Sequence, residues 1–320
     1  MENKLCYSGI GGQALLEGIM MRNRDRYASA VRKQDGTIEV KEEVFPDFQE
    51  KHPWAAWPFI RGTVSLILSL IVGMKTLMWS ASLVDVSDGE GEEPQTLSDK
   101  EMIFTVVIAV VLAVGLFSVL PTVLVNLLRN WLGNGVLLAV VEGVVRLGIF
   151  ILYVALVGLT PDVKRTFMYH GSEHKCINCL EHGLPLTVEN VMKSSKEHRR
   201  CGTSFMLIVM VIAIFFFMLI RIDNIWLRIL SRILLIPVIA GVSYEVIRLT
   251  GSSNSRLAYI ISRPGMWMQK LTTKEPTEDM AEVAIAAVER VFDWRAFLKT
   301  NYGLEVPGPA EEGGTEPSGE

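Results

Sequence analysis

Apolar residues gather in four runs that are long enough, or nearly long enough, to cross a lipid bilayer as helices of about 20 residues. The first contains no charged residue and is interrupted only by Pro121 and a few small polar residues. The second carries Glu142 and Arg146, the third is uncharged but short, and the fourth keeps its charges near its ends. We therefore predict four transmembrane helices, at residues 103–128, 136–159, 205–220 and 225–249.

A fifth apolar run, at residues 63–83, differs from these four in composition. It contains Gly73, Lys75 and several serines, which weaken it as a membrane span. Tryptophans flank or end the run, as expected where a helix meets the boundary between lipid and water: Trp54, Trp57 and Trp79. We interpret it as an interfacial or re-entrant helix, and a true span is the alternative.

Outside the apolar runs, two short elements are predicted. Residues 27–32 and 37–44 are strand-like and flank Gln34-Asp35-Gly36, which is typical of a β-hairpin turn. Near the other end, Thr277 precedes an amphipathic helix at residues 278–292. The predicted fold is an all-α membrane protein with four transmembrane helices, one interfacial or re-entrant helix, a small N-terminal β-hairpin and an amphipathic C-terminal helix.

These elements divide the chain into eight parts. Two pairs of transmembrane helices are separated by a polar loop, and polar segments precede and follow them. An acidic loop comes before the first pair, and the tail, rich in Gly, Pro and Glu, is predicted to be disordered. The predicted parts are the hairpin segment 1–62, the helix 63–83, the acidic loop 84–102, the helix pair 103–159, the loop 160–204, the helix pair 205–249, the helical segment 250–305 and the tail 306–320.

Composition and charge narrow the class of protein. Half of the residues are hydrophobic and 21% are charged, as in membrane spans joined by polar segments, and the formal net charge of -4 argues against nucleic-acid binding. The loop 160–204 carries seven Lys and Arg residues, whereas the connector 221–224 carries a single Arg. The positive-inside rule therefore places the loop in the cytosol, and both termini as well if the run 63–83 does not cross; if it crosses, the N-terminus lies outside. The predicted partners are the lipid bilayer and another membrane protein.

The loop 160–204 contains His170-Gly171-Ser172-Glu173-His174, an H-x-x-E-H arrangement. If the segment is helical, His170 and His174 stand one turn apart on one face and can hold a divalent metal such as zinc. Glu173 then lies beside them, placed to accept a proton from metal-activated water. The same order of residues occurs in inverzincin metallopeptidases. The alternative is a histidine pair that hydrogen-bonds at the membrane surface without metal.

A zinc site needs a third protein ligand besides the two histidines. Glu245 is one candidate, because it follows His174 by a gap comparable to that in H-x-x-E-H peptidases and lies near the cytosolic end of the last predicted span. The alternative for this carboxylate is an ion pair with Arg248. Cys201 is the rival ligand, because thiolate suits zinc and adjacent arginines lower the pKa of a thiol.

Other polar residues extend these hypotheses. Arg200 or Arg199 is a candidate for stabilising an oxyanion. The C-x-x-C pair, Cys176 and Cys179, is a weaker alternative zinc site. Glu142 and Arg146, spaced i and i+4 within a predicted span, are either a structural ion pair or part of a polar transport path.

Five stretches of the chain are typical of a single family: 11–22, 169–175, 198–205, 241–245 and 271–276. They resemble the YqhQ-like family of bacterial membrane proteins, and the resemblance runs from about Gly9 to Phe292. It implies a multi-pass protein of the bacterial cell membrane, described as a predicted metal-dependent enzyme. In that family Thr and Tyr are usual where Cys176 and Cys179 stand here, which disfavours the C-x-x-C zinc site.

The function predicted from these observations is metal-dependent hydrolysis at the cytosolic face of the membrane. Zinc would be held by His170, His174 and either Glu245 or Cys201, with Glu173 as the base. The bond attacked would lie in a membrane protein or a lipid head group. Two alternatives from other classes are a non-enzymatic membrane scaffold with a structural metal and a small transporter that uses Glu142.

Overall fold

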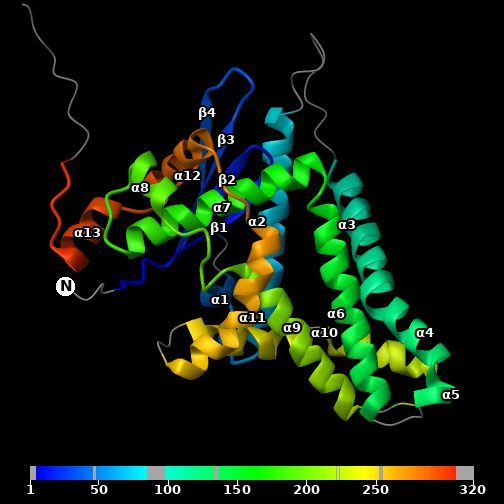
Figure 1. Cartoon of the computed structure of the whole chain (residues 1–320). Coiled ribbons are helices and arrows are strands. Elements are labelled where there is room, and N and C mark those ends of the chain that lie inside the picture. The colour runs from blue at the N-terminus through cyan, green and yellow to red at the C-terminus, as the bar shows by residue number, and fades with distance from the viewer. Residues whose placement is uncertain are drawn as a thin grey trace, which may run out of the picture.

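The structure of the chain is a computed structural model that describes residues 5–45, 48–84, 98–132, 136–220, 222, 224–251 and 255–307. Figure 1 shows a small sheet covered by helices on one side of the molecule and a group of long helices on the other. The predicted acidic stretch at 85–93 lies outside the described residues, as does the tail from residue 308 onward.

A four-stranded antiparallel sheet forms near the N-terminus, with each strand pairing with the next along the chain. The predicted hairpin is confirmed as its second half, and Gly36 in the turn has a positive φ of 84°, which glycine adopts without steric cost. Two further strands precede it that the sequence reading did not predict. The strands are β1 (Ile10–Leu15), β2 (Gly18–Asn23), β3 (Arg26–Arg32) and β4 (Ile38–Val44).

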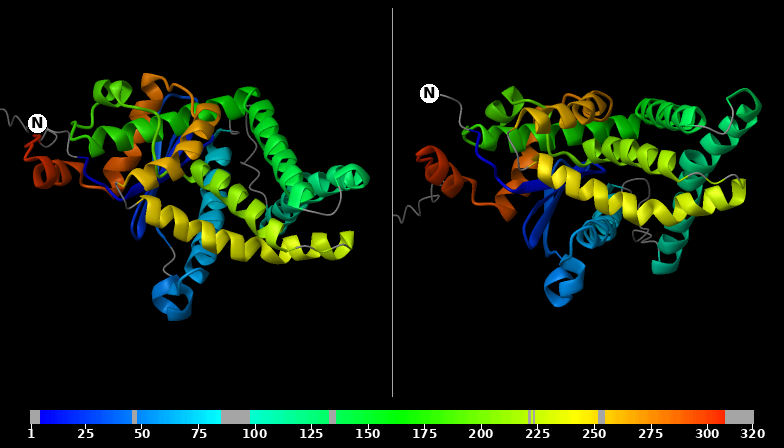
Figure 2. Two further views of the ribbon diagram at one scale, coloured as in Figure 1. Left: turned by 60° about the horizontal axis from the view of Figure 1, so that its bottom comes forward. Right: turned by 90° about the horizontal axis from the view of Figure 1, so that it is seen from below.

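Side chains alternate between the two faces of this sheet, and helices cover both. Ile19 and Met21 pack on one face with the helices α7 and α12, whereas Leu15 and Tyr27 pack on the other with α2. Seen from below in Figure 2, the sheet lies between α7 and α2. The covering helices are α2 (Ile60–Val84), α7 (Pro161–Glu181) and α12 (Glu278–Val291).

Among the residues that the structure describes, four stretches of helix are long and apolar enough to cross a membrane, as many as predicted. One of the four differs from the prediction. The run 63–83, interpreted as interfacial, lies in α2, which is long enough to span, whereas the predicted span 205–220 contains only a shorter apolar helix, Met206–Leu219, in α9. The chain is therefore a helical membrane protein. The helices concerned are α2, α3 (Asp99–Val114) with η3 (Gly115–Val119) and α4 (Leu120–Leu127), α6 (Val136–Val157), α9 (Gly202–Leu219) and α10 (Ile225–Gly251).

The small and polar residues that weaken the run 63–83 as a membrane span lie where α2 packs against the rest of the protein. Val72, Thr76 and Ser80 are buried, and Ser80 Oγ accepts a hydrogen bond from the backbone N–H of Leu16 at 3.3 Å. The second half of α2 therefore packs against the sheet, while the first half packs against α10.

Pro121 alters the helix at 99–127. Proline has no N–H to donate to the carbonyl four residues earlier, which belongs to Phe117, and the chain forms the π-helical turn η3 at this point. Arg146 of α6 donates its Nε to that carbonyl at 2.7 Å. A proline that interrupts regular bonding thus anchors a buried arginine.

The predicted pair of Glu142 and Arg146 is part of a larger buried network. Glu142 accepts hydrogen bonds from Arg146 at 3.1 Å and from Thr122 at 2.8 Å. Arg232 of α10 donates to both oxygens of the same carboxylate. Both guanidinium groups lie over the ring of Phe217, at 4.8 and 5.0 Å from its centroid. This network, which we call the Glu142 network, joins α4, α6, α9 and α10.

The amphipathic C-terminal helix is confirmed as α12, with Thr277 at its N-cap position, although the Thr277 side chain makes no capping hydrogen bond. It packs on the sheet beside α7. Near the sheet and among the long helices there are several shorter helical segments, of which α11 leads back toward α7. They are α1 (Phe48–Lys51), η1 (Pro53–Ala56), α5 (Arg129–Leu132), α8 (Val188–Lys193), α11 (Arg256–Thr272) and α13 (Trp294–Tyr302).

Candidate metal centre

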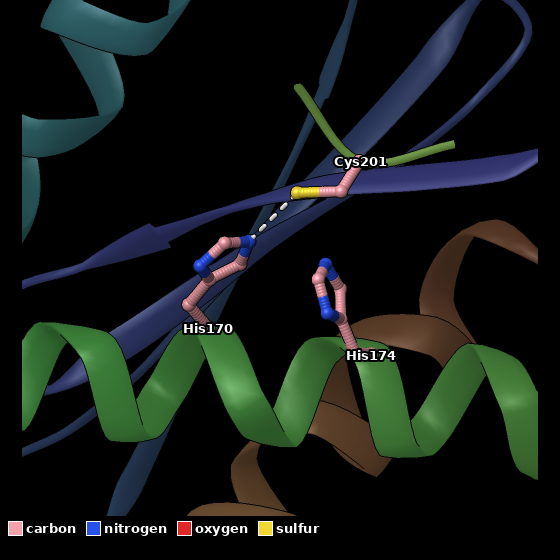
Figure 3. A group of neighbouring side chains, drawn as sticks. All are labelled: His170, His174 and Cys201. Carbon is pink, nitrogen blue, oxygen red and sulfur yellow. Dashed lines mark hydrogen bonds between the residues drawn. The ribbon is translucent and has the colours of Figure 1, made fainter. Parts of the chain in front are cut away.

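The H-x-x-E-H segment lies in the second half of α7, where every residue from Tyr169 to Glu181 is buried. Pro161 stands in the first turn of this helix, where its missing N–H has no intrahelical partner to lose. His170 and His174 project from one face, as predicted, with ring centroids 4.4 Å apart. Figure 3 shows the two rings side by side above α7, with Cys201 opposite them.

Backbone carbonyl groups fix the orientation of both imidazole rings. His170 Nδ1 lies 2.8 Å from the carbonyl oxygen of Thr272, and His174 Nδ1 lies 2.6 Å from that of Lys196. A carbonyl oxygen only accepts, so both Nδ1 atoms carry a proton, and in the neutral form of each ring the lone pair is on Nε2. This is the arrangement by which proteins orient histidines as metal ligands.

Cys201 completes a group of three candidate ligands. Its sulfur lies 3.1 Å from His170 Nε2, and the ligand atoms of Cys201, His170 and His174 all lie within 4.8 Å of one another. Cys201 is the N-cap residue of α9, and its sulfur accepts a hydrogen bond from the N–H of Thr203 at 3.3 Å. The group therefore offers two imidazole nitrogens and one sulfur as ligand atoms.

One buried atom of the group fits the role of a metal ligand. His174 Nε2 is buried and has no hydrogen-bond partner among the described residues. Burial lowers the pKa of His174 despite opposing contacts, chiefly with Cys201, so the imidazole is neutral at pH 7 and can act as a ligand. An orphaned lone pair beside a thiol and a second imidazole fits zinc, which takes nitrogen and sulfur ligands.

Polar residues of α7 hold the loop that carries Cys201. The ammonium group of Lys175 donates to the carbonyl oxygens of Met192 at 2.8 Å and Ser194 at 3.0 Å. Asn178 donates to the carbonyl oxygens of Ser195 at 2.6 Å and Glu197 at 3.0 Å. The sequence reading gave these two residues no role. The polar side chains that recur on the buried face of α7 were the available signal.

Gly171 allows α7 to approach the chain that follows α11. A Cβ atom at this position would lie 2.0 Å from the carbonyl oxygen of Lys274, a contact that no side chain tolerates. The same segment supplies the Thr272 carbonyl that orients His170. Gly171, inside the H-x-x-E-H motif, therefore lets this segment come close enough to hydrogen-bond and orient His170.

Glu173 turns toward β1, the edge strand of the sheet. A Cβ on Gly12 would lie 3.0 Å from the Glu173 carboxyl carbon and 2.7 Å from the carbonyl oxygen of Met20. Burial raises the pKa of Glu173, and the neighbouring imidazoles of His170 and His198 oppose this only in part. Its Oε2 atom is buried without a described partner. A carboxylate in this state is a stronger base than an exposed one.

A second buried carboxylate, Glu181, organises the surroundings of the centre. It accepts hydrogen bonds from the N–H of Ser8 at 3.0 Å and from Arg200 at 3.1 Å, and His198 Nε2 lies 3.4 Å away. Burial works to raise the pKa of Glu181, but these partners outweigh it and the pKa lies below its ordinary value. Arg200 also lies over the ring of Tyr7, 3.9 Å from its centroid.

The structure groups the two histidines with Cys201 and places Glu245 outside that group, in an ion pair with Arg61. Arg61 donates to its carboxylate from Nε at 2.7 Å and from Nη2 at 2.5 Å. Gln13 of β1 contacts α2 at Gly73. Gly73 lies 12 residues after Arg61 in α2, which corresponds to about 18 Å along the helix axis at 1.5 Å per residue. Glu245 thus joins α10 to α2 and is not grouped with the two histidines.

The C-x-x-C pair does not join the group either. Cys176 and Cys179 are fully buried in the hydrophobic core that α7 forms with α12 and the sheet. Burial raises the pKa of Cys176 well above its ordinary value and that of Cys179 to about 12. Both side chains therefore act as small apolar groups of the core.

Comparisons with known proteins agree with the resemblance seen in the sequence. The family model described as "Protein of unknown function (DUF1385)" matches residues 57–294. The uncharacterized protein YqhQ of Bacillus subtilis (strain 168) is 33% identical over 306 residues, which cover 91% of this chain and 94% of the relative. No solved structure matches. Both matches include the three candidate ligands, and neither description states an activity.

Proposed function

The chain belongs to the DUF1385 family of proteins of unknown function, and from that premise we propose that it is a metal-dependent hydrolase of the membrane surface. His170, His174 and Cys201 would hold the metal, and zinc is the ion that suits two imidazoles and a thiolate. Zinc held by three protein ligands supplies a Lewis acid and lowers the pKa of water at the remaining position.

One observation carries this proposal: three buried donors converge, and two buried atoms beside them, His174 Nε2 and Glu173 Oε2, have no partner among the described residues. Leaving polar atoms buried and unpaired costs about 1–3 kcal/mol each, so a fold keeps them where a ligand completes them. Glu173 Oε2 would accept the proton of the attacking water. Arg200, the neighbour of Cys201, would stabilise the negative charge that develops on the substrate.

The location of the centre also supports a substrate in or near the membrane. Residues 160–204, which carry the centre, follow α6 directly and lead into α9. The excess of Lys and Arg in this segment supports a cytosolic position. The bond that is hydrolysed would belong to a peptide segment of a membrane protein or to a lipid head group.

Elemental analysis of the detergent-purified full chain tests the metal. We expect about one zinc per chain in the wild type and background levels in His174→Ala and Cys201→Ala. His182→Ala is the matched histidine control, because His182 caps the same helix and binds the carbonyl of Asn178 outside the group. Zinc retained in His174→Ala, or lost equally in His182→Ala, would overturn the assignment.

Hydrolysis is tested separately with Glu173→Gln, which keeps the three ligands. We expect this variant to retain zinc while membranes that overproduce it fail to accumulate the products seen with the wild type, measured by mass spectrometry of lipids and peptides. If the two membranes have the same product profile and Glu173→Gln still complements a deletion strain that His170→Ala does not, the metal is structural and the protein is a scaffold.

A further inference from the structure

A pocket of about 420 Å³ lies between the sheet and α2, on the face opposite to α7. Gly11 and Gln13 of β1 and Arg22 of β2 line it from the sheet, and Ser69 and Val72 line it from α2. Its volume falls within the range of about 300–1,000 Å³ that is usual for sites of small ligands. We call it the arginine pocket.

Three arginines and no acidic residue are found among the described residues that line the arginine pocket. Arg200 is paired with Glu181 at 3.1 Å. Arg22 and Arg24 form no ion pair with any residue that the structure describes, although Arg22 Nε donates to the carbonyl oxygen of Arg24 at 3.1 Å. The pocket therefore contains two positive charges without a counter-charge from the protein.

Arg22 is also partly withdrawn from water. Its guanidinium carbon lies 3.2 Å from the centroid of the Phe45 ring, and burial lowers its pKa. A cation that loses hydration without gaining a counter-ion is unfavourable, and an anion beside it would offset that loss. Arg24 has a positive φ of 54°, which is strained for a residue with a side chain and is often found where a ligand binds.

We propose that the arginine pocket binds the phosphate group of a phosphate-bearing ligand. The planar guanidinium group binds phosphate oxygens with two parallel hydrogen bonds, and two unpaired arginines match the charge of a phosphate dianion. Gly11 gives the ligand room at the sheet, because a Cβ built there would have no atom within 4 Å. The side chains of Gln13 and Ser69 add neutral hydrogen-bonding groups.

The position of the pocket allows two sources of this phosphate. Val72 and Met20 give it an apolar wall, and α2 is long and apolar enough to cross a membrane, so a phospholipid head group can enter with its chains along α2. A soluble phosphate compound can enter from the side of Tyr7 and Arg200. Phosphate binding does not require metal, so it stands independently of the proposed hydrolysis.

The pocket and the candidate metal centre are nonetheless neighbours. Arg200 lines the pocket and directly precedes Cys201, a candidate ligand. Gly12 lines it as well and lies against Glu173 on the other side of β1.

The test measures ligand binding to the detergent-purified full chain. Inorganic phosphate is titrated by calorimetry, and dioleoyl phosphatidic acid is added to the micelles and followed by native mass spectrometry, with dioleoyl phosphatidylcholine as the comparison lipid. The variants are Arg22→Gln, Arg24→Gln and Gly11→Asp, the last because it places a negative charge in open space. Arg26→Gln is the control, since Arg26 is exposed, pairs with Glu42 and does not line the pocket.

We expect each of the three pocket variants to weaken binding by about tenfold to hundredfold, as for the loss of a charged hydrogen bond, and Arg26→Gln to leave it unchanged. Weakened phosphate titration would indicate a soluble ligand, and weakened binding of phosphatidic acid alone would indicate a lipid head group. The unfolding temperature of every variant is measured, because a lower value than that of the wild type would point to misfolding. Absence of binding to either probe in the wild type, or equal binding by the folded pocket variants, would overturn the proposal.

Discussion

Two clusters of buried polar side chains lie in different parts of the molecule, and they differ in how fully their atoms are bonded. In the Glu142 network, both carboxylate oxygens are bound by arginines, and Phe217 covers the two guanidinium groups. At the candidate metal centre, Glu173 Oε2 and His174 Nε2 have no described partner. A satisfied cluster stabilises the packing of helices, whereas an unsatisfied one is completed by a ligand.

This difference decides between readings that the sequence leaves open. A transport path through Glu142 requires a carboxylate that can exchange partners, but this one is held by three residues from three helices. The H-x-x-E-H histidines, by contrast, are each oriented by a backbone carbonyl at Nδ1, and His174 Nε2 has no partner among the described residues. We therefore propose a structural role for the first cluster and a ligand-binding role for the second.

The largest effect is expected from removing a metal ligand. His170→Ala should abolish zinc binding, because two protein ligands do not hold zinc firmly. The unfolding temperature in micelles should then fall to that of wild-type protein stripped of metal by a chelator. A variant that keeps both its zinc and its chelator-sensitive stability would break the distinction between the two clusters.

The next largest effect is expected from the Glu142 network. Glu142→Gln leaves two buried cations without a counter-charge and should lower the free energy of unfolding by about 3–5 kcal/mol. Zinc per folded chain should not change. Glu189→Gln is the control, because the Glu189–Lys193 pair is exposed and its loss should leave the free energy of unfolding unchanged. A network variant with wild-type stability and altered transport would favour the path through Glu142.

A smaller effect is expected at Gly12. Gly12→Ala forces a Cβ against the Met20 carbonyl and the Glu173 carboxyl, so we expect a loss of about 1–3 kcal/mol and a displaced Glu173. Zinc content should persist while product formation falls. Gly11→Ala on the same strand has open space and should leave both unchanged. Equal behaviour of the two variants would show that the approach of β1 to Glu173 has no consequence.

The smallest effect on the metal is expected from the C-x-x-C pair. Cys176→Ala should leave zinc content unchanged, because this thiol lies in the apolar core. The raised pKa of Cys176 and Cys179 keeps both thiols protonated near pH 8, and the thiolate is the nucleophile, so neither should react with iodoacetamide before unfolding. Labelling is read by peptide mass spectrometry. Loss of zinc from Cys176→Ala would instead favour a site at the C-x-x-C pair.

The sequence is sufficient for features that depend on local spacing. The i, i+4 histidines after Pro161 indicate one helical face, the apolar runs indicate membrane helices, and Gly36 marks a hairpin turn. The first hairpin could not be predicted in this way. Its turn places Glu17 at a φ of 49°, a conformation that Gly or Asn usually adopts. Tertiary contacts stabilise that turn, among them the ion pair of Glu17 with Arg165.

The third ligand depends on long-range packing and could not be chosen from the sequence. Glu245 and Cys201 both satisfy the spacing and charge arguments. What separates them is the position of two other segments: α2 brings Arg61 to Glu245, and α7 binds the loop before Cys201 through Lys175 and Asn178. Neither contact leaves a periodic signal in the chain.

X-ray absorption at the zinc edge of the purified full chain tests the central claim most directly. Coordination by His170, His174 and Cys201 predicts one sulfur at about 2.3 Å and two imidazole nitrogens at about 2.0–2.1 Å, with the remaining position filled by a light atom. Glu245→Gln should leave this spectrum unchanged, and Cys201→Ser should remove its sulfur shell. A shell of nitrogen and oxygen alone, unaffected by Cys201→Ser and altered by Glu245→Gln, would contradict it.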